Sequence, residues 1–218
     1  MAQGRTRLRI VRRGAGLSGE KERALHEAQA RTEMTNRMEH VYRTLRQLTA
    51  RLHELGIPYA VIGSLAMAEH GYERSTVDVN ILVTRDGLHA MKAALRGLGY
   101  VDKFPGSKGL RDTNTNVGID VVLTGDYPGD GKEKPVVFPD PALVAERGRL
   151  GQVLPLRILV ELKLASGLSS PGRLKDLADV LELIRATGLP LGLAEGLDPS
   201  VRDKYVELWH AARITDAE

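Results

Sequence analysis

The chain has 218 residues, of which 42% are hydrophobic and 4% aromatic, and its formal net charge is +3. It has no cysteine, which excludes disulfide bonds and thiolate zinc sites, and no apolar run reaches the roughly 18 residues that a membrane-spanning helix needs. The basic start lacks the apolar core of a secretory signal. We therefore expect a cytoplasmic protein without membrane contacts that folds as one domain, alone or with a small helical appendage.

Residues 1–18 carry five arginines and no acidic residue. Such a segment is typical of a flexible basic tail, and it is also compatible with an arm that makes weak contacts with RNA or DNA phosphates. Leu8, Ile10 and Val11 leave room for a short strand within it.

The next segment, 18–55, has the pattern of a long helix. Its start is rich in acidic residues, which favour the positive end of the helix dipole, and apolar residues recur at intervals of three and four over 38–52. Gly56 and Pro58 end the pattern. The polar part before Met34 is compatible with a solvated helix or with a surface that binds a partner chain.

The stretch 59–83 organises the rest of the chain. A short apolar run, 59–62, has the length and β-branched content of a buried strand, and Gly63 and Ser64 follow it directly. A short helix is predicted next, and Gly71 ends it.

A second strand is predicted from Thr76 to Val83. Because strand side chains alternate between the two faces, its valines and isoleucine share one face, and Asp78 and Asn80 share the other. Two polar side chains therefore point together from a strand that is otherwise apolar.

A third apolar strand, 118–123, carries Asp120 in its middle. Laid beside the strand of Asp78, it would place Asp120 next to Asp78. Two carboxylates repel each other unless a cation lies between them. The pattern therefore predicts a divalent-metal site, Mg²⁺ or Mn²⁺, bound by Asp78 and Asp120, to which Asn80 adds an amide oxygen.

The remaining segments alternate between helices, short strands and loops. The glycine-rich loop 125–134 contains Asp126 and Asp130, which serve either as turn residues or as a replacement metal ligand. The predicted strands are an edge strand at 100–104, a hairpin arm within 107–116 and a short strand at 136–138; the predicted helices are 86–98, one starting at 140–141, 156–165, 170–186 and 199–213.

The central pattern resembles the nucleotidyltransferase superfamily with the polymerase-β-like fold. In that superfamily a strand, a Gly-Ser or Gly-Gly pair and a helix precede a strand with Asp-x-Asp, and a later strand carries a third Asp. Gly63, Ser64, Asp78 and Asp120 match this order, whereas the second acid is Asn80.

Two further patterns extend the resemblance to about residues 59–184. The form Gly-x-x-Arg-x-Thr-x-Asp-x-Asp, here starting at Gly71 and including Arg74, Thr76 and Asp78, is seen in uncharacterised bacterial nucleotidyltransferases and AbiEii-type toxins. Their C-terminal helices carry a Lys and then Arg-x-Lys-Asp-x-x-Asp. The matching residues here are Lys163, Arg173, Lys175, Asp176 and Asp179.

The resemblance implies an α+β fold, in which a nucleotidyltransferase-like mixed β-sheet is flanked by helices and followed by a C-terminal helical part. We divide the chain accordingly into a tail, 1–18, a core with its N-terminal helix, 19–140, and the helical part, 141–218.

The resemblance also implies a function. The protein would move a nucleoside monophosphate from a nucleoside triphosphate to a hydroxyl of RNA, protein or a small molecule, with Asp78 and Asp120 on the metal and Asp120 helping to deprotonate the hydroxyl. Because Asn80 replaces the second acid, the alternative is a catalytically lapsed protein that binds nucleotide, RNA or a partner protein, including as a toxin–antitoxin component.

Four residues are candidates for binding the nucleotide. Gly63 and Ser64 form either a tight strand–helix turn or a phosphate cradle of backbone N–H groups. Arg74 either neutralises phosphate or pairs with Glu73 or Glu69. Lys163 stands on a mainly apolar helix, where it needs an anionic partner, either the phosphates or a salt bridge to Asp176 or Asp179.

Overall fold

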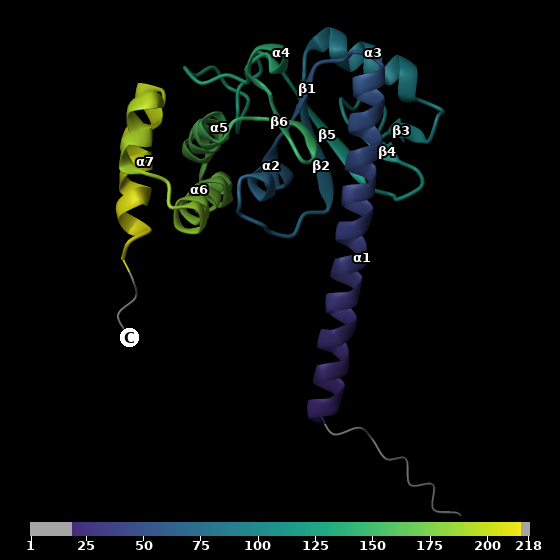
Figure 1. Ribbon diagram of the computed structural model, residues 1–218, viewed down its shortest axis with the longest axis horizontal. Coiled ribbons are helices and arrows are strands. Elements are labelled where there is room, and N and C mark those ends of the chain that lie inside the picture. The colour runs from purple at the N-terminus through teal and green to yellow at the C-terminus, as the bar shows by residue number, and fades with distance from the viewer. Residues whose placement is uncertain (1–18, 215–218) are drawn as a thin grey trace, which may run out of the picture. The chain divides into compact units, whose positions relative to one another are not determined.

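The computed structural model describes residues 19–214 (Figure 1). The chain forms two compact units, residues 1–36 and residues 37–218. The described part of the first unit is the beginning of helix α1 (Gly19–Glu54), whose side chains from 21 to 36 are exposed. The long helix expected near the N-terminus is therefore confirmed, whereas the basic tail predicted for 1–18 lies outside the described residues.

The described part of the second unit contains one mixed sheet of seven strands in the order β3-β4-β5-β2-β1-β7-β6. At its centre β2 pairs with β5 in parallel and with β1 in antiparallel orientation. The strands are β1 (Tyr59–Val61), β2 (Asp78–Val83), β3 (Tyr100–Asp102), β4 (Leu110–Asp112), β5 (Gly118–Leu123), β6 (Glu146–Gly148) and β7 (Gly151–Val153).

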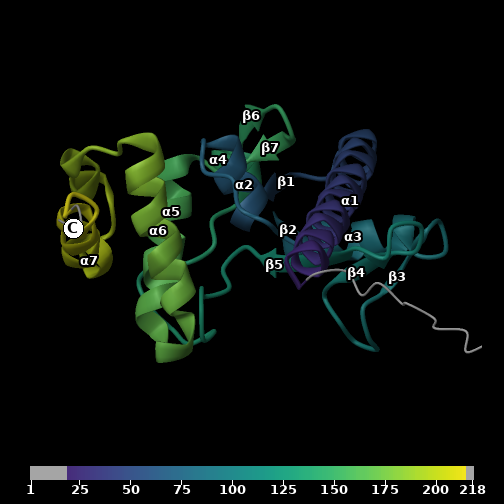
Figure 2. The ribbon, with the colours of Figure 1, turned by 90° about the horizontal axis from the view of Figure 1, so that it is seen from below.

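Helices of the second unit cover both faces of this sheet, and each face has its own buried apolar core. The part of α1 after residue 37 and α3 (Arg85–Leu95) pack on one face, and α2 (Gly63–Glu69), α5 (Leu156–Ser169) and α6 (Leu174–Thr187) contribute to the core on the other (Figure 2). The remaining helical segments are α4 (Pro141–Val144), η1 (Pro171–Arg173), η2 (Leu191–Gly196) and α7 (Pro199–Ala211). The expected α+β architecture with a helical C-terminal part is confirmed.

Strand β2 shows the predicted alternation. Val79, Ile81 and Val83 are fully buried in the core beneath α1 and α3, and Asp78 and Asn80 alternate with them toward the face of α2 and α5. The strand begins at Asp78 rather than Thr76.

The register between β2 and β5 corrects one expectation. Asp120 lies opposite Asn80, and Gly118 lies opposite Asp78, so the two acids are diagonal neighbours rather than a direct pair. This register places Ile81 opposite Val121 and keeps the buried apolar residues of both strands aligned on the same face, which decides it over a shifted pairing.

The sheet edge beyond β1 was not predicted. The strand expected at 136–138 is not formed; instead Phe138 exchanges backbone hydrogen bonds with loop residues Gly125, at 2.8 Å, and Asp126, at 3.0 Å. The hairpin of β6 and β7 extends the sheet, with Val153 opposite Val61. Strands of only three residues carry too little periodicity for prediction.

Among the helices in residues 19–214, none combines the length and the apolar character needed to span a bilayer.

Tyr205, on α7, gives the helical part a measurable dependence on pH. Its side chain is fully buried, its hydroxyl donates to the carbonyl of Pro190 at 2.9 Å, and burial raises the pKa of Tyr205 from 10.0 to about 12, opposed by Arg213. The stabilisation is complete below pH 10.0 and is lost as the pH rises through about 12, because the unfolded chain releases this proton first. We expect the free energy of unfolding of the wild type to fall by about 2 kcal/mol more than that of Tyr205→Phe over this range in denaturant titrations; equal slopes would contradict the assignment.

Candidate functional site

Three polar side chains share one face of the two central strands. Asp78 and Asn80 come from β2 and Asp120 comes from β5, and all three are partly exposed. They lie on the side of the sheet opposite Val79, Ile81 and Ile119, which are buried. The structure therefore brings together the predicted metal-binding residues on one surface, as required for a shared ligand.

A lysine that the sequence did not single out is paired with one of these acids. Nζ of Lys103, just beyond β3, forms an ion pair with Oδ1 of Asp120 at 2.8 Å. The side chain of Lys103 passes close to Gly109 and Gly118, where a Cβ would come within 2.9 Å of its Cδ and 3.1 Å of its Nζ respectively. No local pattern marks Lys103, because its partner is 17 positions further along the chain.

Asp78 differs from Asp120 in having no ion-pair partner within the part of the chain that the structure describes. Among residues 19–214, its carboxylate takes part in no ion pair, whereas its carbonyl oxygen accepts a hydrogen bond from the Thr76 hydroxyl at 3.2 Å. A Cβ on Gly118 would lie 2.4 Å from Oδ1 of Asp78, so the glycine provides the space that this carboxylate occupies. Asp78 is therefore available as a ligand.

The turn between β1 and α2 reaches the same face. Gly63 has a φ of +67°, a left-handed conformation that favours glycine, and a Cβ there would lie 3.4 Å from Nδ2 of Asn80. Ser64 follows it and is buried, at 5% exposure. The strand–glycine–helix turn is confirmed as a structure, and Gly63 lies beside the Asn80 side chain.

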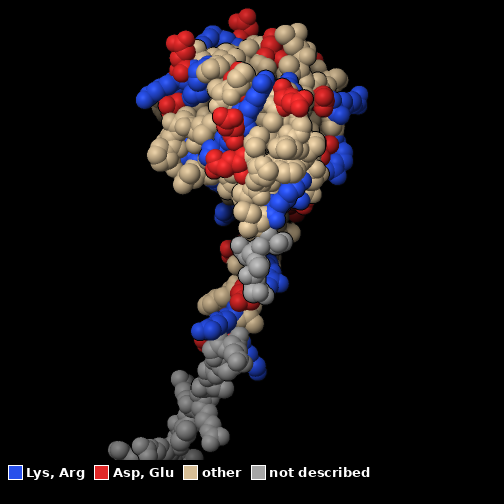
Figure 3. Space-filling view, turned by 90° about the vertical axis from the view of Figure 1, so that its left-hand side faces the viewer, with Lys and Arg blue, Asp and Glu red and all other residues tan. Residues whose placement is uncertain are grey.

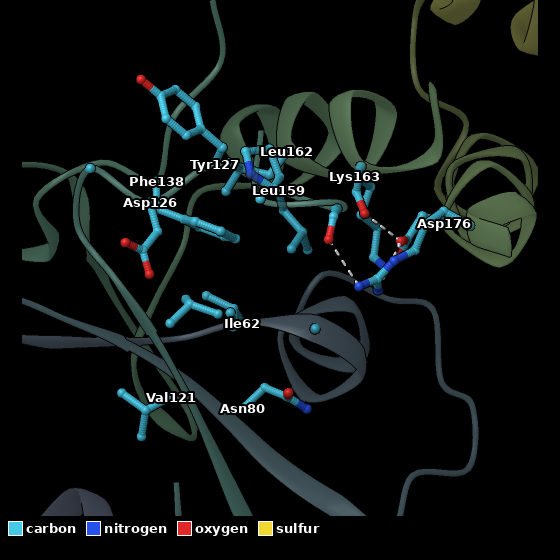
Figure 4. A pocket seen from close by; sticks show the side chains of 18 of the residues that line it. Ile62, Asn80, Val121, Asp126, Tyr127, Phe138, Leu159, Leu162, Lys163 and Asp176 are labelled. Carbon is cyan, nitrogen blue, oxygen red and sulfur yellow. Dashed lines mark hydrogen bonds and ion pairs between the residues drawn. The ribbon is translucent and has the colours of Figure 1, made fainter. Parts of the chain in front are cut away.

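A cavity of about 710 Å³ opens next to Asn80 and Gly63 (Figure 4). Asn80 and Val121 lie on its sheet side, and Lys163 and Asp176 lie across it on the helical side. The loop 125–131 forms a third wall. Of the predicted site residues, Asn80, Gly63 and Lys163 line this cavity, whereas Asp78, Asp120, Ser64 and Arg74 do not.

Lys163 is already paired within the protein. Its Nζ lies 2.6 Å from Asp179 and 3.1 Å from Asp176, and its side chain is 9% exposed. Of the two explanations for this lysine, the salt bridge is the one that the structure shows. Ser166 also donates to Asp176, at 2.7 Å, so the network joins α5 to α6.

Arg74 belongs to the same network. Its Nε lies 2.9 Å from Oδ1 of Asp179, so the expected pairing with Glu73 or Glu69 was wrong. Asp179 is 3% exposed and faces Arg74 and Lys163. The positive charges of Arg74 and Lys163 thus balance the negative charges of the two acids of α6, at the contact between α5 and α6.

The acids of the loop 125–134 have structural partners. Asp126 pairs with Lys108 at 2.6 Å, and Asp130 pairs with Lys134 at 2.6 Å and accepts a backbone hydrogen bond from Lys132. The hydrogen bond from Lys134, followed by that from Lys132, holds the pKa of Asp130 below its ordinary value. These contacts favour the turn explanation over a replacement metal ligand.

The residues present fit one divalent ion better than two. Within residues 19–214, no group of three or more His, Asp or Glu side chains is placed to hold a metal. Two carboxylates and the Asn80 amide suffice for Mg²⁺, which binds through one or two carboxylates and leaves its other positions to water and substrate phosphates. A second ion would lack the charge that an acid at position 80 would supply.

No protein-family model matches the chain, and no curated protein matches its sequence. Among solved structures, the chain is similar to ANT(2″)-Ia in complex with adenylyl-2″-tobramycin, with a TM-score of 0.49 and 12% identity over 79% of this chain and 96% of that chain. It is also similar to the solution structure of the antibiotic-resistance factor ANT(2″)-Ia, with a TM-score of 0.49 and 14% identity over 77% of this chain and 95% of that chain.

Proposed function

We propose that the chain is a metal-dependent nucleotidyltransferase, which moves a nucleoside monophosphate from a nucleoside triphosphate to a hydroxyl and releases pyrophosphate. The observation that carries this proposal is the shared sheet face of Asp78, Asn80 and Asp120, of which Asn80 lines the cavity together with Gly63. A volume of about 710 Å³ lies in the range of small-molecule sites and accommodates a nucleotide. The acceptor hydroxyl belongs to RNA, a protein or a small molecule.

Asp78, Asn80 and Asp120 would hold one Mg²⁺ or Mn²⁺ ion. When bound, the ion neutralises phosphate charge and favours an in-line arrangement of the attacking oxygen. The side chain of Asp120 is 46% exposed, and it would accept the proton of the acceptor hydroxyl. Asp78 carries no competing ion pair among the described residues and would be the main ligand.

The triphosphate would lie between the Gly63 turn and α5. Gly63 and Ser64 would offer backbone N–H groups, and Lys163 lines the cavity on its other side. Because the charge of Lys163 is already matched by Asp176 and Asp179, its part is to fix the cavity wall rather than to supply net positive charge. Arg74 braces that wall through Asp179.

Two observations favour a second candidate, a lapsed protein that binds nucleotide, RNA or a partner, including as a toxin–antitoxin component. Asn80 weakens the metal site by one negative charge, and Lys103 already forms an ion pair with Asp120.

The side of the second unit where α7 lies shows no continuous basic surface that would favour RNA binding. Lys and Arg side chains are interspersed there with Asp and Glu (Figure 3).

A transfer assay separates the two candidates. The purified full chain is incubated with each labelled triphosphate, Mg²⁺ or Mn²⁺, and total tRNA, total protein or a panel of hydroxylated small molecules. Metal-dependent label transfer that Asp78→Ala abolishes supports the enzyme. Absence of transfer from the wild type, with transfer gained by Asn80→Asp, supports the lapsed protein. Calorimetry that detects neither metal nor nucleotide binding would overturn the enzyme and the nucleotide-binding form of the second candidate.

A further inference from the structure

Lys103 has no role in the function proposed above, yet it is paired with one of the two carboxylates of the site. Its Nζ is 2.8 Å from Oδ1 of Asp120. The position that a Cβ would take on Gly118 lies 3.1 Å from the same Nζ and 2.4 Å from Oδ1 of Asp78. The ammonium is therefore paired with Asp120, and both it and the Asp78 carboxylate border the space that Gly118 leaves open, on the face where Asn80 brings no charge.

Two glycines make room for the lysine side chain. A Cβ on Gly109 would come within 2.9 Å of Cδ of Lys103, and a Cβ on Gly118 would come within 3.3 Å of its Cε. The Lys103 side chain is accordingly only 21% exposed. A solvated surface lysine would need no such space, so the sheet holds this ammonium in place against the acids.

Neighbouring cations do not serve these acids. Lys92 and Arg96 both pair with Asp102, and Lys108 pairs with Asp126. Among the residues that the structure describes, Lys103 is therefore the cation that forms an ion pair with Asp120.

The charges of the face indicate what the lysine does. Asp78 and Asp120 contribute two negative charges, Asn80 contributes none, and Lys103 returns one positive charge. The net negative charge that remains attracts one divalent ion, whereas two ions would repel each other and the ammonium. An acid in place of Asn80 would add a negative charge, which would allow a further divalent ion to bind.

We propose that Lys103 is a built-in cation that takes the place of a second divalent ion beside Asp78 and Asp120, so that the site binds a single ion in competition with the lysine. The role of that ion in transfer rests on the proposed function, but the competition itself does not. Lys103 is a positioning residue in this account, since it acts through the carboxylate of Asp120.

The test is a Mn²⁺ titration of the full chain without nucleotide, followed by electron paramagnetic resonance. The wild type is expected to bind one Mn²⁺ weakly. Lys103→Met keeps the length of the side chain and removes its charge, and we expect about tenfold tighter binding of Mn²⁺ as the competing charge is lost. A purely structural lysine predicts the opposite, because its loss would disturb the acids and weaken binding. Unchanged or weaker Mn²⁺ binding by Lys103→Met would overturn the proposal.

Two further variants serve as controls for the Mn²⁺ titration. Lys103→Arg retains the charge and is expected to keep wild-type Mn²⁺ affinity; a gain equal to that of Lys103→Met would contradict the competition. Lys108→Met breaks a comparable lysine–aspartate pair at 2.6 Å that lies beside one acid only, and no gain is expected. If Lys103→Met does not fold, Lys103→Gln takes its place with the same expectation.

Failure of the inference and failure of the proposed function leave different results. If the wild type transfers label and Lys103→Met binds Mn²⁺ no more tightly than the wild type, the inference is wrong and the proposed function stands. Tighter Mn²⁺ binding by Lys103→Met without transfer under any condition removes the function and supports the inference.

Discussion

Replacing Asp78 with asparagine is expected to reduce nucleotidyl transfer by on the order of a hundredfold or more while leaving the folded state at least as stable as the wild type. The two effects separate because the Asp78 carboxylate has no ion-pair partner among residues 19–214 and lies diagonally across from Asp120, a like charge. Asparagine keeps the shape of the side chain and removes this repulsion, but it leaves Asp120 as the last charged ligand. Transfer rates and thermal unfolding of the same preparations measure both effects.

Asp126→Asn is the matched control for this prediction. Asp126 lines the cavity that Asn80 borders and pairs with Lys108, so its loss removes no proposed metal ligand. We expect a reduction in transfer well below that of Asp78→Asn. If Asp126→Asn were as damaging as Asp78→Asn, the replacement-ligand explanation for the loop would return. If Asp78→Asn transferred at the wild-type rate, the proposed site would be wrong.

Lys163→Met is expected to lower the free energy of unfolding by about 3–5 kcal/mol. Removing this lysine leaves Asp179, which is 3% exposed, with Arg74 alone, and leaves Asp176 with Arg173 at 3.9 Å. A buried carboxylate that loses a hydrogen-bonded cation keeps its desolvation cost, which explains the size of the effect. Denaturant titration of the full chain measures it.

An exposed ion pair of the same kind provides the comparison. Lys204 pairs with Glu207 on α7, where the glutamate side chain is 64% exposed, and Lys204→Met is expected to cost less than about 1 kcal/mol. If Lys163→Met were as mild as Lys204→Met, and nucleotide binding nevertheless fell sharply, the lysine would serve phosphate rather than the junction of α5 and α6. Loss of both stability and binding is expected, because the cavity wall depends on that junction.

The pairing of Lys163 changes the meaning of a pattern that the sequence shows clearly. The sequence offered a salt bridge to Asp176 or Asp179 as one of two explanations for Lys163, and the structure pairs the lysine with both acids. Spacing alone left two partners open for the lysine, phosphate or acid. The choice between them depends on how closely α5 approaches α6. The sequence of either helix alone does not determine that distance.

Local periodicity determined a large part of this protein. The alternation along β2 predicted that Asp78 and Asn80 share a face. The position of Gly63 after an apolar strand predicted a tight turn, and its φ of +67° is a conformation that favours glycine. These features involve residues within a few positions of one another, where chain stereochemistry alone limits the choices.

Only the tertiary structure decided which distant residues meet. It placed Asp120 opposite Asn80, paired Arg74 with Asp179 across 105 positions, and brought Lys103 to the acids through glycines at 109 and 118. Strand register depends on aligning apolar faces from two separate segments, and ion pairs of this kind follow from that alignment rather than from any local pattern. For that reason the sequence determined the acids of the site, and the fold determined the cation that already lies among them.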